Sequence, residues 1–399
     1  MKKLLIIALL LPFASFAQLA DSVKIEAPKK HWYENIGIRG YMQVRYNRLA
    51  ETNPKLKCDQ CDRSWGENGG ISLRRVRIYV WGQIHPRVYL YIQPDFASSA
   101  STTALHFGQI RDAYMDVSFD DKREFRVRLG QSKIPFGFEN MQSSQNRLPL
   151  DRNDALNSPL SNERDLGAFF YWAPDKIRKR FSHLVNDNLK GSGDYGVVGL
   201  GVFNGQTANR PELNNQLHAV ARVTYPFQVG SQIIEPSIQG YTGHYVIPAD
   251  QITKGVKTDA HRSYLDKRAA ATLVLYPQPF GIQAEYNIGK GPEFNLADTS
   301  IQSKDLHGGY VTLSYFIKYK TQAIFPFVRM QYYNGGKKFE LDARSYTVNE
   351  YEAGIEWQPI RNFELVAMYT ISKRRFEDFA APKNTQEGQL LRLQAQVNF

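Results

Sequence analysis

The C-terminal end of the chain alternates strictly between apolar and polar side chains. One face of this segment would carry Leu391, Leu393, Ala395, Val397 and Phe399. The opposite face would carry Leu390, Arg392, Gln394, Gln396 and Asn398. A period of two residues is typical of a β-strand with one apolar and one polar face. The pattern recurs in residues 363–372 and 87–96, so we expect a protein built from many such strands.

This alternation predicts sixteen strands, while helical periodicity is found only near Lys176–Leu189. The predicted strands cover residues 37–48, 71–83, 86–97, 109–119, 123–132, 164–173, 194–204, 214–225, 232–246, 260–276, 279–290, 306–318, 322–334, 347–358, 361–373 and 388–399.

The predicted connections alternate between short and long. Short turns are predicted at Gly82–Pro86, Asp120–Arg123, Tyr225–Ser231, Tyr276–Pro279, Tyr319–Thr321 and Gln358–Arg361. Long loops are predicted at Leu49–Gly70, Ser98–Gly108, Lys133–Glu163, Gly205–Leu213, Ile247–Ala260, Lys290–Asp305, Gly335–Tyr346 and Arg374–Glu387. The connection Pro174–Gly193 is long where the scheme requires a short one. Tight turns at one rim and long loops at the other are typical of an up-and-down outer-membrane barrel.

The amphipathic strands need an apolar environment for one face. A sandwich in water buries its apolar faces against each other, whereas a barrel in lipid turns them outward and encloses the polar faces. Many charged residues fall within the polar faces, which favours the barrel. We therefore predict an all-β fold: a transmembrane antiparallel β-barrel of about 16 strands, with long outer loops and short periplasmic turns.

Composition agrees with a membrane barrel and excludes several other classes. Of the 399 residues, 42% are hydrophobic and 22% are charged, which excludes a disordered chain. The mean hydropathy of −0.45 excludes an ordinary helical membrane protein. The formal charge of +11 indicates, for an exported protein, an anionic solute or membrane surface rather than nucleic acid.

The N-terminus has the features of an export signal. Basic Lys2 and Lys3 precede an apolar run from Leu4 to Phe13, and Ser15-Phe16-Ala17 supplies the small residues of a cleavage site. We predict a signal peptide at 1–17, a periplasmic N-terminal segment at 18–36 and a barrel at 37–399. The predicted location is the outer membrane of a Gram-negative bacterium, in contact with its lipid. A terminal aromatic such as Phe399 on an alternating strand resembles the signal read by the barrel assembly machinery.

Several motifs, in order, resemble those of one porin family. They are Ile71-Ser72-Leu73-Arg74-Arg75-Val76-Arg77-Ile78, Ile110-Arg111-Asp112-Ala113-Tyr114-Met115-Asp116, Arg126-Val127-Arg128-Leu129-Gly130-Gln131-Ser132-Lys133-Ile134-Pro135-Phe136-Gly137, Arg164-Asp165-Leu166-Gly167 and Gly201-Val202-Phe203-Asn204-Gly205. Together they resemble the phosphate-selective porin O and P family. The resemblance implies a sixteen-stranded pore, a third outer loop (133–163) that folds inward as a constriction, and a homotrimer.

Basic residues on the predicted lumen faces would determine selectivity. We assign ten of them to the anion pathway. Alternation places Arg39, Arg45, Arg75, Arg77, Arg126 and Arg128 on the lumen faces. The loop residues Lys133, Arg147, Arg152 and Arg164 would join them if the third long loop folds inward, as the resemblance implies. The planar guanidinium of Arg binds oxyanions through two hydrogen bonds. Acidic residues are predicted on the same faces: Asp112, Asp116, Glu285, Glu350, Glu352, Glu356 and Glu364. Neighbouring Arg and Glu side chains that pair would leave less charge for solutes.

These features predict a porin for passive diffusion of small solutes, with a preference for phosphate or other oxyanions. Cys58 and Cys61 are expected to form a loop disulfide, and Asp59, Asp62 and Glu67 are a weaker candidate for calcium. We expect no enzymatic activity, cofactor or metal. Two alternatives remain: a barrel whose loops are enzymatic or adhesive, which needs a convergent reactive cluster, and a secreted β-sandwich, which would be soluble without detergent.

Overall fold

The computed structural model describes residues 31–56, 58, 61, 65, 70–97, 106–159 and 163–399. The predicted signal peptide (1–17) and residues 18–30 of the predicted N-terminal segment lie outside the described residues. Asp59, Asp62 and Glu67 of the first long loop also lie outside them. A short 3-10 helix, η1 (Trp32–Asn35), leads into the first strand.

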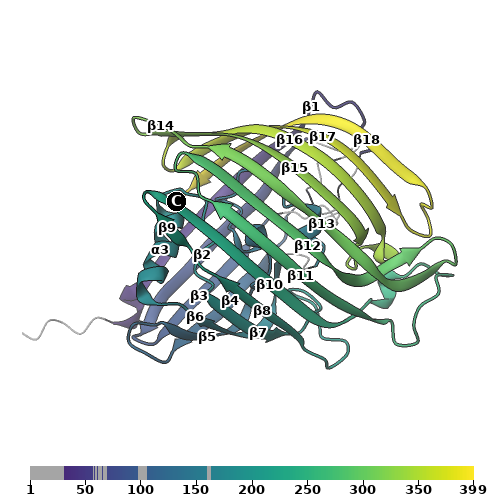
Figure 1. Ribbon diagram of the computed structural model, residues 1–399, viewed down its shortest axis with the longest axis horizontal. Coiled ribbons are helices and arrows are strands. Elements are labelled where there is room, and N and C mark those ends of the chain that lie inside the picture. The colour runs from purple at the N-terminus through teal and green to yellow at the C-terminus, as the bar shows by residue number, and fades with distance from the viewer. Residues whose placement is uncertain are drawn as a thin grey trace, which may run out of the picture.

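Sixteen antiparallel strands form the wall of a barrel (Figure 1). They are β1 (Ile36–Leu49), β2 (Ile71–His85), β3 (Val88–Asp95), β4 (Gln109–Ser118), β5 (Phe125–Lys133), β6 (Arg164–Trp172), β7 (Val198–Phe203), β8 (His218–Thr224), β10 (Gln232–Val246), β11 (Ser263–Leu275), β12 (Phe280–Asn295), β13 (Ser300–Tyr315), β15 (Gln322–Gly336), β16 (Ser345–Ile360), β17 (Phe363–Glu377) and β18 (Asn384–Asn398). Short β9 (Phe227–Val229) continues β8, because both pair with β10. Short β14 (Ile317–Tyr319) continues β13, because both pair with β15.

The first strand closes the ring. β1 pairs with β2 on one side and with β18 on the other, so that Tyr41 lies opposite Arg77 and opposite Asn398. The C-terminal residue extends this seam: the Phe399 N–H donates to the Gly40 carbonyl, and the Gly40 N–H donates to the Phe399 carbonyl. This closed sixteen-strand antiparallel barrel confirms the predicted fold class.

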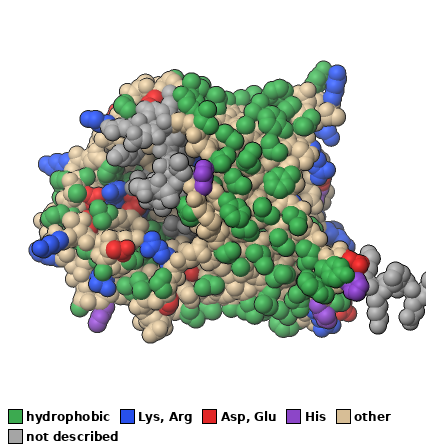
Figure 2. Space-filling model, turned by 180° about the vertical axis from the view of Figure 1, so that it is seen from behind, with side chains coloured by type: hydrophobic (Ala, Val, Ile, Leu, Met, Phe, Trp, Pro, Cys, Tyr) green, Lys and Arg blue, Asp and Glu red, His purple; other side chains and the backbone are tan. Residues whose placement is uncertain are grey.

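The apolar faces of the strands point outward. On β10, Ile238 is 67% exposed, whereas Glu235, three residues away on the other face, is 1% exposed. Seen from outside, hydrophobic side chains cover much of the wall, and Lys and Arg gather toward its two ends (Figure 2). A sandwich would bury these apolar faces. Their exposure in a closed ring is the arrangement expected for strands in lipid.

Two of the predicted long loops are wrong. Strands β12 and β13 continue to the pair Asn295 and Ser300, and β17 and β18 continue to the pair Phe376 and Asn384. Most of the loops predicted at Lys290–Asp305 and Arg374–Glu387 is therefore paired strand. The alternation failed there because these hairpin ends carry charged and polar residues on both faces.

The connection between β6 and β7 holds the predicted helix. Helix α3 (Asp175–Asn186) lies at the rim that also holds β9 and β14 (Figure 1). The described residues contain no helix that is both long and apolar enough to span a membrane. Other helical turns are α1 (Phe138–Met141), α2 (Asp154–Asn157), η3 (Ala249–Gln251) and η4 (Leu341–Ala343).

Candidate pore constriction

The connection between β5 and β6 crosses the interior of the barrel. We call its described part, residues 134–159 and 163, loop L3. Its helix α1 begins against Glu285 of β12, whose carboxylate accepts hydrogen bonds from the N–H groups of Phe138 (2.6 Å) and Glu139 (2.8 Å). The first N–H groups of a helix have no partner within the helix, so this carboxylate satisfies them. Because β12 is the eleventh strand of the ring and L3 starts from the fifth, the loop spans the bore.

A second helical turn of L3 is held on the same far wall. Asn153 caps α2, since its side chain accepts a hydrogen bond from the Leu156 N–H at 2.9 Å. The Asp154 N–H donates to Gln331 of β15 at 2.9 Å. The Asn287 amide of β12 donates to the Ala155 carbonyl, also at 2.9 Å.

Buried acids of L3 are paired with basic residues of the wall. Arg45 lies 3.1 Å from Asp151, Arg374 lies 3.0 Å from Asp154, and Arg329 lies 3.0 Å from Glu139. The ion pairs of L3 with the wall also include Arg392 with Asp151 and Lys337 with Asp154. These contacts fix the loop to β1, β15, β17 and β18, and to the loop after β15.

The charges around L3 lower the pKa values of three of its carboxyl groups, those of Asp151, Asp154 and Glu163. Burial alone would raise the pKa of Asp151, but the guanidiniums of Arg45 and Arg392 outweigh burial and hold this pKa well below its usual range. The pKa of Asp154 is lowered in the same way, with burial opposed by Arg374 and Lys337. Burial also acts against ionisation of Glu163, yet Arg152 and Arg164 hold the pKa of its carboxyl far below the usual range.

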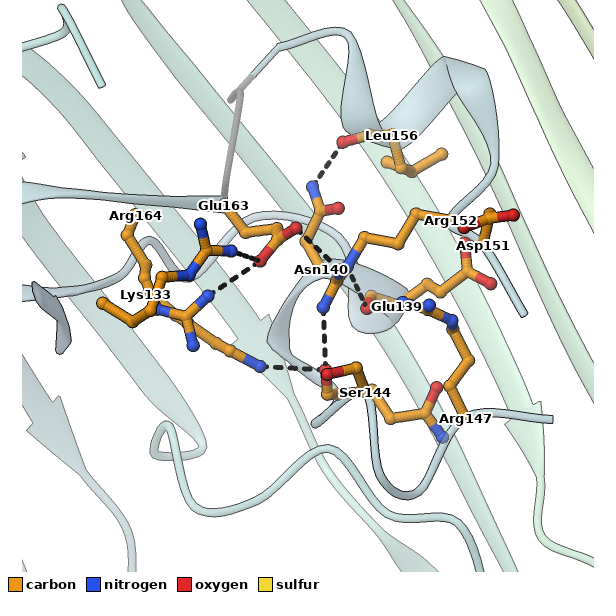
Figure 3. A network of polar contacts seen from close by, with 12 residues as sticks. Lys133, Glu139, Asn140, Ser144, Arg147, Asp151, Arg152, Leu156, Glu163 and Arg164 are labelled. Atoms are coloured by element: carbon orange, nitrogen blue, oxygen red, sulfur yellow. Dashed lines mark hydrogen bonds and ion pairs between the residues drawn. The ribbon is translucent and has the colours of Figure 1, made fainter. Parts of the chain in front are cut away.

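Three buried cations, one within L3 and two beside it, have no carboxylate partner among the described residues. Arg75 of β2, 4% exposed, donates to the side chain of Gln43 at 2.9 Å. Arg147, 5% exposed, donates to the carbonyls of Pro149 and Leu150. Lys133, 7% exposed, donates to the carbonyls of Met141 and Gln142 at 2.8 and 2.9 Å. We call Arg75, Lys133 and Arg147 the unpaired cations. Figure 3 shows the L3 network that includes Lys133 and Arg147.

The other predicted pathway residues divide into two groups. Six form ion pairs in the interior: Arg45 with Asp151, Arg77 with Asp95, Arg126 with Asp194, Arg128 with Asp116, Arg152 with Glu163, and Arg164 with Asp112. Arg39 is exposed toward the rim, with its guanidinium 5.5 Å from the ring centres of Tyr79 and Trp81. The structure therefore brings nine of the ten into the interior, and it places Arg39 apart from them.

The acids predicted on the lumen faces are all buried there. They are Asp112, Asp116, Glu285, Glu350, Glu352, Glu356 and Glu364. Several of them neutralise basic residues that sequence reasoning left out, as Glu352 does for Arg329 at 2.5 Å. Most of the charged side chains on the inner wall are therefore paired with an opposite charge.

Sequence reasoning missed several interior cations. Arg111 is 6% exposed, 3.8 Å from Glu163. A register shift between Gln93 and Pro94 inserts an extra residue into β4, so that Arg111 and Asp112 are both buried and strict alternation fails. Others lie on predicted strands whose alternation already pointed inward: Arg222, Arg268, Arg329 and Arg392. The faces of those strands were a sufficient signal, whereas Arg374, which falls in a predicted long loop, and Lys337, in the loop after β15, offered none.

The first long loop contains the expected disulfide between Cys58 and Cys61. Among the described residues, no group of three or more His, Cys, Asp or Glu side chains could hold a metal ion.

A closed sixteen-strand barrel with a loop across its bore defines a porin-type channel of the outer membrane. A family profile described as phosphate-selective porin O and P matches residues 56–399. The chain therefore belongs to the phosphate-selective porin O and P family. A comparison with curated proteins gave no match.

Solved porins and channels share the fold at low sequence identity. The outer membrane channel DcaP of Acinetobacter baumannii is 14% identical, with a TM-score of 0.56 over 91% of this chain and 97% of that one. OmpF of Salmonella typhi, solved with daunomycin, is 10% identical, with a TM-score of 0.55 over 92% and 98%. OmpT of Vibrio cholerae is 9% identical, with a TM-score of 0.52 over 91% and 97%.

Proposed function

We propose that this porin is a passive diffusion channel of the Gram-negative outer membrane that prefers small anions, phosphate or other oxyanions. The observation that supports the preference is the set of unpaired cations, Arg75, Lys133 and Arg147, buried in or beside L3, where most other charges are paired with an opposite charge. A solute anion at this level would meet positive charge that no described carboxylate neutralises. The proposal assigns the chain no enzymatic activity.

Two of the unpaired cations retain unused donors. The Nε of Arg75 and the Nη1 of Arg147 are buried without a hydrogen-bond partner among the described residues. A buried donor without a partner costs free energy, and a charged acceptor would remove that cost. An anion 4 Å from one such cation gains about 1 kcal/mol in bulk water and about 4 kcal/mol at an effective dielectric constant near 20. Several cations together would favour anions by about tenfold or more.

We further propose that residues 133–163 form the outer constriction of this channel. Support comes from the bonds that tie L3 to strands on the far side of the ring, such as those of Glu285 and Gln331. The proposal includes a homotrimer in outer-membrane lipid, and delivery by the barrel assembly machinery through Phe399, whose ring lies at the exposed end of the β1–β18 seam.

The preference is tested by reversal potentials of the purified protein in planar bilayers under a salt gradient. The variant Arg75→Gln with Arg147→Gln should lower the anion-to-cation permeability ratio several-fold, because it removes two uncompensated charges. Arg87→Gln is the matched control, since Arg87 is exposed at the rim and paired with Asp121. An unchanged ratio in the double variant would reject the assignment.

A further inference from the structure

The connection between β6 and β7 is longer than the other connections at its rim and has its own apolar face. We call residues 174–193 the inner insertion. Its helix α3 buries Ile177, Phe181 and Leu184, which follow one another by four and three residues and so share a helix face. Lys176, Lys179 and His183 are exposed on the remaining surface.

The apolar face of α3 packs against the inner wall of the barrel. It packs in one cluster with Ile233 of β10, Val274 of β11 and Phe138 of L3. Ile233 shares its strand face with buried Glu235, and Val274 shares its face with buried Thr272, so both point into the bore. Apolar residues at these two lumen positions interrupt the polar lining, and the helix covers them.

Beyond α3 the insertion crosses the bore. Leu189, Lys190 and Ser192 are 5%, 5% and 8% exposed. The Lys190 ammonium lies 2.5 Å from the Glu356 carboxylate of β16, and the Asn188 amide donates to Gln358 of β16 at 2.8 Å. In the ring of sixteen, β7 is the seventh strand and β16 the fourteenth, so this contact joins nearly opposite walls.

The insertion also meets L3 in the interior. The Gln142 amide of L3 donates to the Lys190 carbonyl at 2.7 Å. The Gln142 carbonyl in turn accepts hydrogen bonds from Lys133 (2.9 Å) and Arg152 (3.2 Å). One hydrogen-bonded chain therefore links the unpaired cation Lys133 to the insertion and to the far wall at Glu356.

From this geometry we propose that the inner insertion is a second constriction, which with L3 sets the upper size of the solutes admitted. This inference rests on the proposed channel function. A barrel of sixteen strands leaves an aqueous channel, but two segments that cross it from opposite rims and touch leave a narrower passage. The channel would then admit small ions and exclude oligosaccharides.

The principal test replaces residues 175–192 with an Asn-Gly turn, the connection that short hairpins favour. We expect a several-fold larger single-channel conductance, and uptake of a trisaccharide in liposome swelling assays that the wild type does not show. Conductance and size limit equal to those of the wild type, in a variant that keeps the heat-modifiable gel band of a folded barrel, would overturn the inference.

A second variant tests the proposed size limit if the shortened chain does not fold. Lys190→Met with Glu356→Gln removes the ion pair to β16 but keeps the apolar contacts of α3 with β10, β11 and L3. Lys179→Met with Asp175→Asn is the matched control, because that pair lies on the exposed face of the same helix. A higher rate of trisaccharide uptake in the first variant alone supports the inference, and equal rates overturn it. Reversal potentials test anion preference separately, so its failure would not be mistaken for failure of the size limit.

Discussion

At the residue scale, the buried charged residues of the barrel interior are of two kinds: those paired with an opposite charge and those without such a partner among the described residues. Asp154 shows the paired case: it is fully buried, and Arg374 and Lys337 both contact its carboxylate. Arg147 shows the other case, since its guanidinium contacts only backbone carbonyls. The first kind of residue holds a loop in place, and the second leaves positive potential for a solute.

The variant Asp154→Asn should destabilise the barrel by about 3–5 kcal/mol, because it removes one carboxylate from two buried cations. Arg374 would keep only Glu350, at 2.8 Å, and Lys337 only the more distant Glu340, at 3.8 Å. Glu387→Gln is the control: Glu387 pairs with Lys373 at the surface, where such pairs contribute about 1 kcal/mol or less. Unfolding in guanidinium chloride, followed by the gel band shift, measures both. Equal midpoints for the two variants would contradict the structural role of Asp154.

The same comparison has a defined pH dependence. The pKa of Asp154 is lowered in the folded state, so its pairs stabilise the protein above the ordinary Asp pKa of about 3.9 and lose that effect as pH falls through the lowered value. The difference in stability between wild type and Asp154→Asn should therefore be constant from pH 5 to 8 and shrink below about pH 4. A difference that grows on acidification would be contrary to this sign.

At the scale of the strand, alternation alone predicted the number and order of the wall strands, because each strand has one face toward lipid and one toward the bore. It failed where that contrast disappears, as at the hairpin end after Arg374, and where an extra residue shifts the register, as at Arg111. It placed Arg75 and Arg77 on one face but could not show that only Arg77 has a carboxylate, Asp95. Pairing depends on the register between neighbouring strands, which places Arg77 of β2 directly opposite Asp95 of β3 and which the alternation within one strand does not show.

The seam between β1 and β18 depends on a glycine. A Cβ on Gly40 would lie 2.4 Å from the Arg77 carbonyl oxygen and 2.5 Å from the Phe399 ring. Gly40→Ala should therefore lower the stability of the closed barrel by about 1–3 kcal/mol, the usual range for overpacking. Gly70→Ala, where nothing lies within 4 Å of the new Cβ, should be close to neutral. The midpoint of the band shift in guanidinium chloride distinguishes them, and equal midpoints would show that the seam tolerates a side chain.

At the scale of the whole molecule, the fold turns the usual distribution of side chains inside out. Charged residues such as Arg374 and Glu356 are fully enclosed, while Ile38 and Ile71 are 71% and 79% exposed. Such a surface is stable only against acyl chains, since a contiguous exposed apolar wall in water favours aggregation. The same alternation places the polar side chains and the unpaired cations in the interior. One sequence pattern therefore accounts both for the lipid-facing wall and for the polar bore.

The inversion predicts how the outer wall responds to charge. Ile238 lies at the middle of β10 on the outer face and is 67% exposed. Ile238→Arg should reduce the folded barrel recovered in the outer-membrane fraction, because Arg near the bilayer midplane costs about 2–4 kcal/mol. Val229→Arg is the control, since Val229 is equally open at 65% but lies on β9 at the rim, where the cost falls to about 0–1 kcal/mol. The folded fraction is measured by heat modifiability after membrane fractionation. If both variants accumulate equally, the exposed face of β10 does not lie against acyl chains, and a water-exposed wall would explain the result better.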